Sequence, residues 1–110
     1  MSTPLASRIC VPCRGGTPPL TPEAAEALHE QTPKWDLTDG ATWLRRSFKF
    51  DNFLGALDFV NKVGKLAEEA GHHPDIAFGW GYADISVQTH KIKGLHENDF
   101  ILAAKIDALS

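Results

Sequence analysis

Two kinds of hydrophobic spacing alternate along this chain, and this alternation restricts the fold more than any other feature of the sequence. From residue 51 to residue 70 the apolar side chains recur every three or four positions, which is the spacing of an amphipathic helix. These positions are Phe53, Ala56, Leu57, Val60, Val63, Ala67 and Ala70. Just before them, Leu44, Phe48 and Phe50 stand at even spacing with polar residues between them, as in a strand with one apolar face. The sequence therefore predicts helix and sheet within one chain.

Thr21 and Pro22 mark the start of an earlier helix, because a hydroxyl N-cap followed by proline is typical of a helix N-terminus. We expect this helix to run to about Gln31, since the residue before Pro33 avoids helical backbone angles. Trp35 follows directly after this stop, and a short strand is expected there. The first third of the domain thus contains one helix and one short strand.

Glycines divide the second half of the chain. Gly71 is expected to end the long helix in the left-handed conformation that other residues resist. Residues 76–80 and 82–90 then alternate as two strands joined by a tight turn, and His90 is expected to point with the polar set of the second strand. Residues 96–109 are predicted to form a closing helix.

The order helix, strand, helix, strand, strand, helix, with the short strand near Trp35, predicts an α+β domain in which helices cover one face of an antiparallel sheet. The chain has 110 residues, enough for a single core, which we assign to residues 21–110. Residues 1–20 hold four prolines and two glycines and are predicted to be a flexible N-terminal tail. An uncovered sheet face or a free sheet edge would favour self-association.

Composition and charge exclude several classes of function. Eleven Lys and Arg against 14 Asp and Glu give a formal net charge of −3, so the chain lacks the basic surface of a direct nucleic-acid binder. No uncharged run is as long as the roughly 18 apolar residues of a membrane span. The N-terminus lacks the apolar core of a secretory signal, which favours the cytoplasm. Cys10 and Cys13 form a C-x-x-C pair without a second ligand pair, and we expect no role in a metal or redox site for them.

Three of the five histidines, His72, His73 and His90, are predicted at the ends of elements rather than inside apolar faces. Histidine suits proton transfer in both directions near neutral pH, because its unperturbed pKa is about 6.5. Two other interpretations stay open: simple helix-end caps, and a metal site completed by Asp99. Metal binding is disfavoured, because adjacent histidines in an extended segment point apart.

Other candidate residues are ambiguous when each is taken alone. Asp99, at the start of the closing helix, is by default a solvated carboxylate favoured by the helix dipole, and Glu68 is by default a surface charge. Trp43 is expected to pack in the core. His29 and His96 are expected to have no catalytic role, with His96 at the cap of the closing helix.

The spacing of these residues is more informative than any one of them. The chain reads Glu68, three residues, His72-His73-Pro74, five residues, Trp80, nine residues, His90, eight residues, Asp99. This pattern resembles the signature of the pterin-4a-carbinolamine dehydratase family. The resemblance covers roughly residues 20–110. It departs at His96, where family members commonly have the Ser or Thr that makes a stronger helix cap.

The resemblance implies a four-stranded antiparallel sheet with three helices packed on one face, assembled as homodimers or homotetramers. It also implies a lyase that dehydrates 4a-hydroxytetrahydrobiopterin to quinonoid dihydropterin and water. This step belongs to tetrahydrobiopterin recycling and links the protein functionally to aromatic amino acid hydroxylases such as phenylalanine hydroxylase. The pterin is the substrate, and neither a metal nor an organic cofactor is implied. The alternative is a non-catalytic dimerisation or assembly partner of another protein.

The resemblance also assigns the site residues. The general acid–base histidines fall on His72, His73 and His90. The substrate-binding positions fall on Trp35, Glu68, Pro74, Thr89 and Asp99. In this assignment Trp35 supplies an aromatic wall for the pterin, while Glu68 and Asp99 orient histidines or accept from ring nitrogens. Which histidine is the acid and which is the base stays open.

Overall fold

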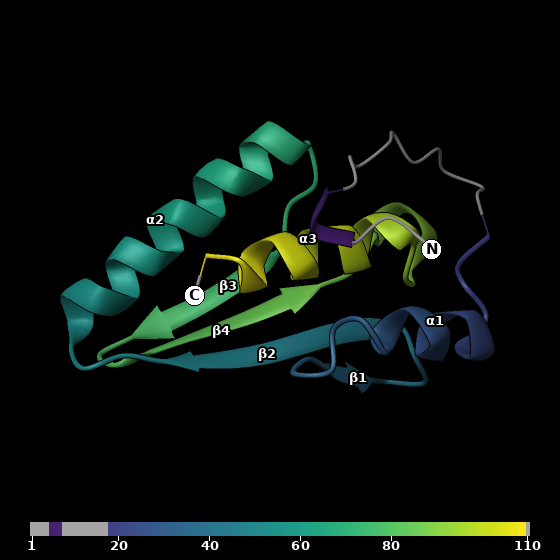
Figure 1. Cartoon of the computed structure of the whole chain (residues 1–110), viewed down its shortest axis with the longest axis horizontal. Helices are drawn as coiled ribbons and strands as arrows, with labels where there is room; N and C mark the ends of the chain where they lie inside the picture. The colour runs from purple at the N-terminus through teal and green to yellow at the C-terminus, as the bar shows by residue number, and fades with distance from the viewer. Residues whose placement is uncertain (1–4, 8–17, 110) are drawn as a thin grey trace.

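The computed structural model describes residues 5–7 and 18–109, and within them an antiparallel sheet carries helices that pack on one shared core (Figure 1). The strands run in the order β1-β2-β4-β3. The elements are a 3-10 turn η1 (Leu5–Ser7), α1 (Pro22–His29), β1 (Asp36–Thr38), β2 (Trp43–Lys49), α2 (Phe53–Ala70), β3 (Asp75–Gly79), β4 (Tyr82–Val87), a 3-10 turn η2 (His90–Ile92) and α3 (Glu97–Asp107).

Side-chain and glycine caps set the ends of the first two helices. Thr21 Oγ1 accepts from Ala24 N at 3.2 Å and begins α1, as its sequence predicts. Asn52 Oδ1 accepts from Gly55 N at 2.8 Å and begins α2. Gly71 ends α2 with φ +67°, the left-handed conformation expected from the sequence.

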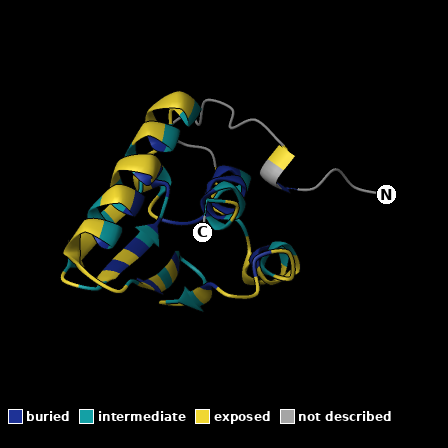
Figure 2. Cartoon of the chain, turned by 60° about the vertical axis from the view of Figure 1, so that its left-hand side comes forward, coloured by how far each residue is buried: buried dark blue, intermediate teal, exposed yellow. Residues whose placement is uncertain are grey.

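Alternation along the two central strands sorts their side chains onto opposite faces of the sheet. Leu44 and Phe48 of β2 are buried and pair across the ladder with Val87 and Ala83 of β4, while the residues between them are more exposed. Buried and exposed residues alternate as stripes along these strands in Figure 2. The other face of the sheet therefore carries Arg45 and Ser47 of β2 and Asp84 and Ser86 of β4, whereas Arg46 shares the face of Leu44 and Phe48.

Helix α3 lies in the middle of the core and is buried along most of its length. Trp35 packs into the same core at 1% exposure, and its Nε1 donates to Asp107 Oδ1 at 2.8 Å. Asp107 also forms an ion pair with Arg46, whose guanidinium lies 4.2 Å from the centroid of the Phe48 ring. The carboxylate of Asp107 thus provides a partner for the Trp35 indole N–H and for the Arg46 guanidinium, whose burial without a partner would cost free energy.

The structure confirms the fold predicted from the sequence: an α+β chain with a four-stranded antiparallel sheet and three helices, within the described residues. The prediction that His90 belongs to the last strand is wrong. β4 ends at Val87, because Thr89 N bonds to Gly94 O at 2.9 Å and the chain turns through η2 instead. His90 therefore stands on a turn, outside the sheet.

The N-terminal region is described at residues 5–7 and from residue 18 onward. Leu5 is 2% exposed and belongs to the core, with η1 in contact with α3. Leu20 N donates to Leu95 O at 2.8 Å. Leu5 and Leu20 thus contact the rest of the described chain, and the flexible tail over residues 1–20 stays a prediction. Cys10 and Cys13 lie outside the described residues. Among the helices described, none combines the length and apolar character needed to cross a bilayer.

Substitution by alanine should have opposite effects at Gly64, inside α2, and at Gly71, which caps its C-terminal end. A Cβ added at either position would have no other atom within 4 Å, so the two substitutions differ only in their effect on the backbone conformation. Gly71→Ala should destabilise the protein by about 1–2 kcal/mol, because φ is positive there. Gly64→Ala, inside the helix, should stabilise it by about 0.5–1 kcal/mol. Urea unfolding of both variants measures the difference, and shifts of the same sign would contradict the assigned backbone conformations.

Candidate active site

The carboxylate of Asp99 is the centre of the candidate site. The side chain is 0% exposed, and its Oδ1 lies 2.6 Å from His72 Nε2. Its Oδ2 accepts from Thr89 Oγ1 at 2.7 Å and from His96 N at 2.9 Å. These partners come from the segment after α2, from the segment after β4 and from the start of α3. One buried carboxylate therefore connects three separate parts of the chain.

The first turn of α3 places this carboxylate. His96 is the N-cap, and its Nδ1 accepts from Asn98 N at 3.1 Å, while Asp99 accepts from His96 N in return. This is a capping box built with an imidazole instead of a hydroxyl. The helix dipole favours a negative charge at this end of α3. The cap expected at His96 is confirmed, whereas the default interpretation of Asp99 as a solvated carboxylate is wrong.

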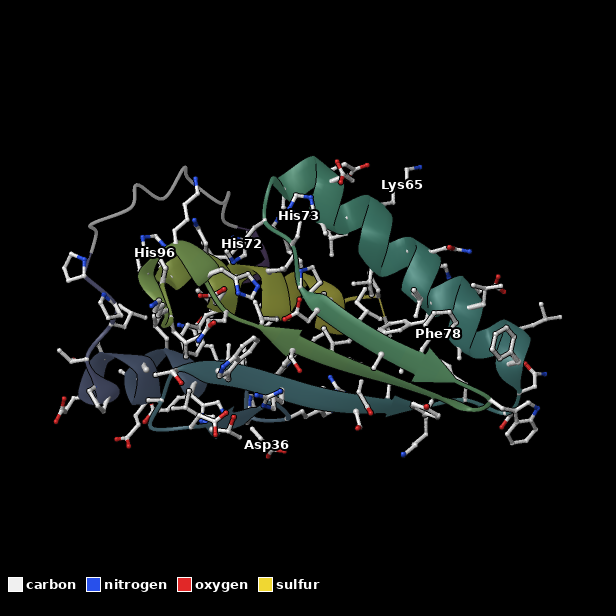
Figure 3. All side chains as sticks on the ribbon, turned by 180° about the vertical axis from the view of Figure 1, so that it is seen from behind. Asp36, Lys65, His72, His73, Phe78 and His96 are labelled. Atoms are coloured by element: carbon white, nitrogen blue, oxygen red, sulfur yellow. The ribbon has the colours of Figure 1, made fainter. Side chains whose placement is uncertain are left out.

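His72 is directed at Asp99 by the backbone that follows α2. After Gly71, His72 N donates to Ala67 O at 3.2 Å, and Pro74 keeps the next residues extended. His72 and His96 lie at the same end of the molecule, near the C-terminal end of α2 (Figure 3). The His72 side chain is 13% exposed. Its Nε2 is engaged by the carboxylate of Asp99.

The neighbouring histidine has a different environment. His73 Nε2 lies 3.0 Å from Glu68 Oε1, and both side chains are well exposed. An exposed pair of this kind adds little to stability but limits the orientations of the ring. The adjacent His72 and His73 are thus held by two carboxylates, one buried and one in solvent.

His90 is the first residue of η2, directly after Thr89. Its Nε2 lies 3.8 Å from Asp75 Oδ2, and its ring centroid lies 5.8 Å from that of Trp43 in an edge-to-face arrangement. Since Thr89 is bonded to Asp99, the segment that carries His90 and the segment that carries His72 are tied to the same carboxylate. The structure therefore brings these two histidine segments together around Asp99.

Of the remaining residues assigned from the sequence, Thr89 and Pro74 lie at the site and Trp35 does not. Thr89 is 5% exposed and its hydroxyl is used on Asp99, and Pro74 is half-buried between His73 and β3. Trp35 does not join the group: at 1% exposure it offers no free ring face to a ligand. The structure thus gives no support to an aromatic wall from Trp35 and assigns its ring to core packing.

Sequence reasoning missed two residues at this site, Asp75 and Trp43. Asp75 directly follows the His-His-Pro triplet, a position that could have drawn attention to it. Trp43 alternates with the buried Leu44, so it shares one face of β2 with Arg45 and Ser47. This polar face of the strand could have indicated that Trp43 lies outside the core. The expectation that Trp43 packs in the core is wrong, since it is half-buried beside His90.

This arrangement can carry out proton transfer. It contains three histidine–carboxylate pairs, which are His72–Asp99, His73–Glu68 and His90–Asp75. A neutral imidazole accepts a proton and an imidazolium donates one, so such pairs can serve as general bases and general acids. Over residues 5–7 and 18–109, no three His, Cys, Asp or Glu side chains gather in a way that could hold a metal ion.

Comparison with known proteins adds an independent observation. A family model described as pterin 4 alpha carbinolamine dehydratase matches residues 18–109. A relative in Methylococcus capsulatus, provisionally named as a pterin-4-alpha-carbinolamine dehydratase, is 59% identical over 106 residues, which are 96% of this chain and 93% of that protein.

Two solved structures share this fold. One, a transcriptional coactivator/pterin dehydratase from Brucella melitensis, has a TM-score of 0.77 and 30% identity and covers 83% of this chain and 97% of that one. The other, a pterin dehydratase-like protein identified as a RuBisCO assembly factor in the alpha-carboxysome, has a TM-score of 0.60 and 28% identity. It covers 69% of this chain and 88% of its own.

The burial of Asp99 predicts that two similar substitutions differ in cost. Asp99→Asn replaces one carboxylate oxygen, which only accepts hydrogen bonds, with an NH2 group, which donates them. This NH2 group would face Thr89 or the His72 ring at a fully buried position. It should destabilise the protein by about 1–3 kcal/mol. Glu68→Gln makes the same chemical change at an exposed pair and should cost less than about 0.5 kcal/mol. Equal costs in urea unfolding would argue against Asp99 as the centre of the site.

Proposed function

The chain belongs to the pterin 4 alpha carbinolamine dehydratase family, and on this premise we propose that it is a hydro-lyase acting on 4a-hydroxytetrahydrobiopterin. The proposed products are quinonoid dihydropterin and water. The observation that carries the proposal is the buried Asp99 carboxylate, which holds His72 directly and the His90 segment through Thr89. His72, His73 and His90 are the proposed acid–base residues.

The chemistry of the reaction asks for these groups. The C4a–O bond breaks while an acid gives a proton to the leaving oxygen, so that the hydroxyl departs as water. The lone pair of N5 forms the new C4a–N5 double bond, and a base accepts the proton that N5 then loses. Atoms and charge balance with one acid and one base, and no electron is gained or lost. Two histidines in different protonation states can supply both roles.

The carboxylates and Thr89 have supporting roles in this proposal. Asp99 is fully buried, so it acts on the substrate through His72 rather than by contact. Thr89 acts in the same indirect way, since its hydroxyl is bonded to Asp99. Glu68 orients His73 from the solvent side. Pro74, half-buried beside the histidines, is the proposed contact for the substrate ring, in place of the buried Trp35.

The reaction implies a biological setting, which we also propose. The 4a-hydroxylated pterin is made by aromatic amino acid hydroxylases, so the protein would act next to an enzyme such as phenylalanine hydroxylase in tetrahydrobiopterin recycling. The substrate and product are small polar molecules of the cytoplasm, where we expect the protein to work. The chain's net charge of −3 does not favour direct binding to nucleic acid.

A second candidate is a non-catalytic assembly partner of another protein. It is favoured by the solved relative identified as a RuBisCO assembly factor. It is also favoured by a set of exposed apolar side chains, which are Phe53, Leu54, Phe78, Trp80 and Tyr82. Each of the three histidines nevertheless has a carboxylate beside it, which an assembly partner would not need. We therefore favour the enzyme.

We further propose that the chain self-associates through the edge of its sheet. β3 is the last strand in the order, paired with β4 on one side. An edge strand exposes backbone groups that a second copy can pair with. The apolar Phe78 on this strand is 36% exposed, which would add buried area to such a contact. A homodimer or homotetramer is the expected assembly.

Loss of His72 or of His90 should slow the dehydration reaction. Generated 4a-hydroxytetrahydrobiopterin should decay faster with the protein than without it, followed by ultraviolet absorbance. His72→Ala and His90→Ala should each lower kcat by roughly 10²- to 10⁴-fold. His29→Gln is the control, because His29 lies on α1 and its Nε2 bonds to the Trp35 carbonyl instead. Equal decay with and without the unmodified protein would move the assignment to the assembly partner.

The edge-strand proposal predicts how one added charge changes the assembly. Sedimentation velocity across micromolar concentrations should give a dimer or tetramer for the unmodified protein. Ala77→Lys puts a lysine on the exposed side of β3 and should shift the equilibrium toward monomer. Ala27→Lys adds the same charge to an exposed position of α1 and should change nothing. A monomer at every concentration would contradict the proposal.

A further inference from the structure

His90 is held differently from His72. The His72 ring is fixed by a 2.6 Å contact to a buried carboxylate. The His90 side chain is 59% exposed, and the carboxylate of Asp75 lies 3.8 Å from its Nε2, beyond hydrogen-bond distance. Such a contact attracts the ring without fixing its direction. A defined orientation of this imidazole therefore needs a second contact besides Asp75.

The ring of Trp43 is in position to do so. Its centroid lies 5.8 Å from that of His90, and the two planes meet at 71°, an edge-to-face geometry that aromatic rings prefer. Trp43 begins β2, and its backbone pairs with Thr38 of β1. Beside it, Gln88 Nε2 donates to Thr42 O at 3.1 Å and joins the end of β4 to the start of β2. The indole is thus mounted on the sheet, next to the turn that carries His90.

Arg45 also contacts the indole. Its guanidinium carbon lies 4.7 Å from the centroid of the Trp43 ring, within the range of a cation–π contact. The guanidinium is itself fixed, because it donates to Thr38 Oγ1 at 3.2 Å, to Ser86 Oγ at 3.1 Å and to Asp39 Oδ2 at 3.1 Å. An exposed arginine with three side-chain acceptors is a rigid support for a ring.

One row across the sheet connects this support with Asp75. Ser86 pairs with Arg45 on one side and with Asp75 on the other. Asp75 is the first residue of β3, directly after Pro74. The carboxylate of Asp75 and the indole of Trp43 therefore approach His90 from two different strands, β3 and β2, of one sheet. His90 has a defined place even though it stands on an exposed turn.

From this geometry we propose that Trp43 is a positioning residue for His90. Together with Asp75, Trp43 sets the orientation that the His90 ring needs for proton exchange with the pterin. The proposal rests on the proposed dehydratase function for its substrate. Trp43 does not touch the reacting atoms in this account. A misdirected imidazole slows proton transfer without removing the group, because the rate depends on the alignment of donor and acceptor.

Kinetics of a double-substitution cycle test the proposal. Trp43→Leu should lower kcat by roughly tenfold with little change in KM. Trp43→Phe keeps an aromatic ring and should recover most of that loss. In a chain that already carries His90→Gln, Trp43→Leu should cost less than about twofold, because its effect acts through His90. A loss of equal size in both backgrounds would overturn the proposal.

A spectroscopic readout separates this proposal from the proposed function. The ring current of Trp43 should displace the imidazole proton resonances of His90, identified by their absence in His90→Gln. Trp43→Leu should remove this displacement, and Trp80→Leu, which removes an exposed indole on the β3–β4 turn, should not. Unchanged His90 resonances in Trp43→Leu would refute the positioning role. An inactive unmodified protein would refute the dehydratase, while the resonances still decide whether Trp43 holds His90.

Discussion

The buried carboxylate of Asp99 is the interaction on which the rest of the candidate site depends. A fully buried charge is tolerated only when partners surround it, and Asp99 has three, supplied by His72, Thr89 and the backbone of His96. Meeting this requirement draws the end of α2, the end of β4 and the start of α3 to one point. Stability of the core and geometry of the site therefore have a common cause.

The three histidines differ in what restrains them, and this difference fits acid–base chemistry. His72 is coupled to a carboxylate within the core, whereas His73 and His90 meet exposed carboxylates at the surface. His90 gains further definition from Trp43, which the sheet and Arg45 hold in place. Groups of one residue type in unlike surroundings can take unlike protonation states, as an acid and a base must.

The two faces of the sheet carry different groups of side chains. Its apolar face joins α1, α2 and α3 through a core that includes Trp35 and Phe48. Its polar face carries the row from Arg45 through Ser86 to Asp75, next to His90. The outer edge of β3 and the exposed aromatic side chains offer surface for the proposed self-association. The core, the polar row and the free edge of β3 thus occupy different parts of the sheet.

The sequence by itself determined the order of the helices and strands, the fold class and the family, because periodicity, caps such as Thr21 and Gly71, and motif spacing are properties of short stretches. It could not show that Trp35 is buried while Trp43 is not, or that His90 leaves the sheet. Only the tertiary structure decided which carboxylate meets which histidine. The physical reason is that such contacts join distant residues, as His72 and Asp99 are 27 positions apart, and only packing brings them together.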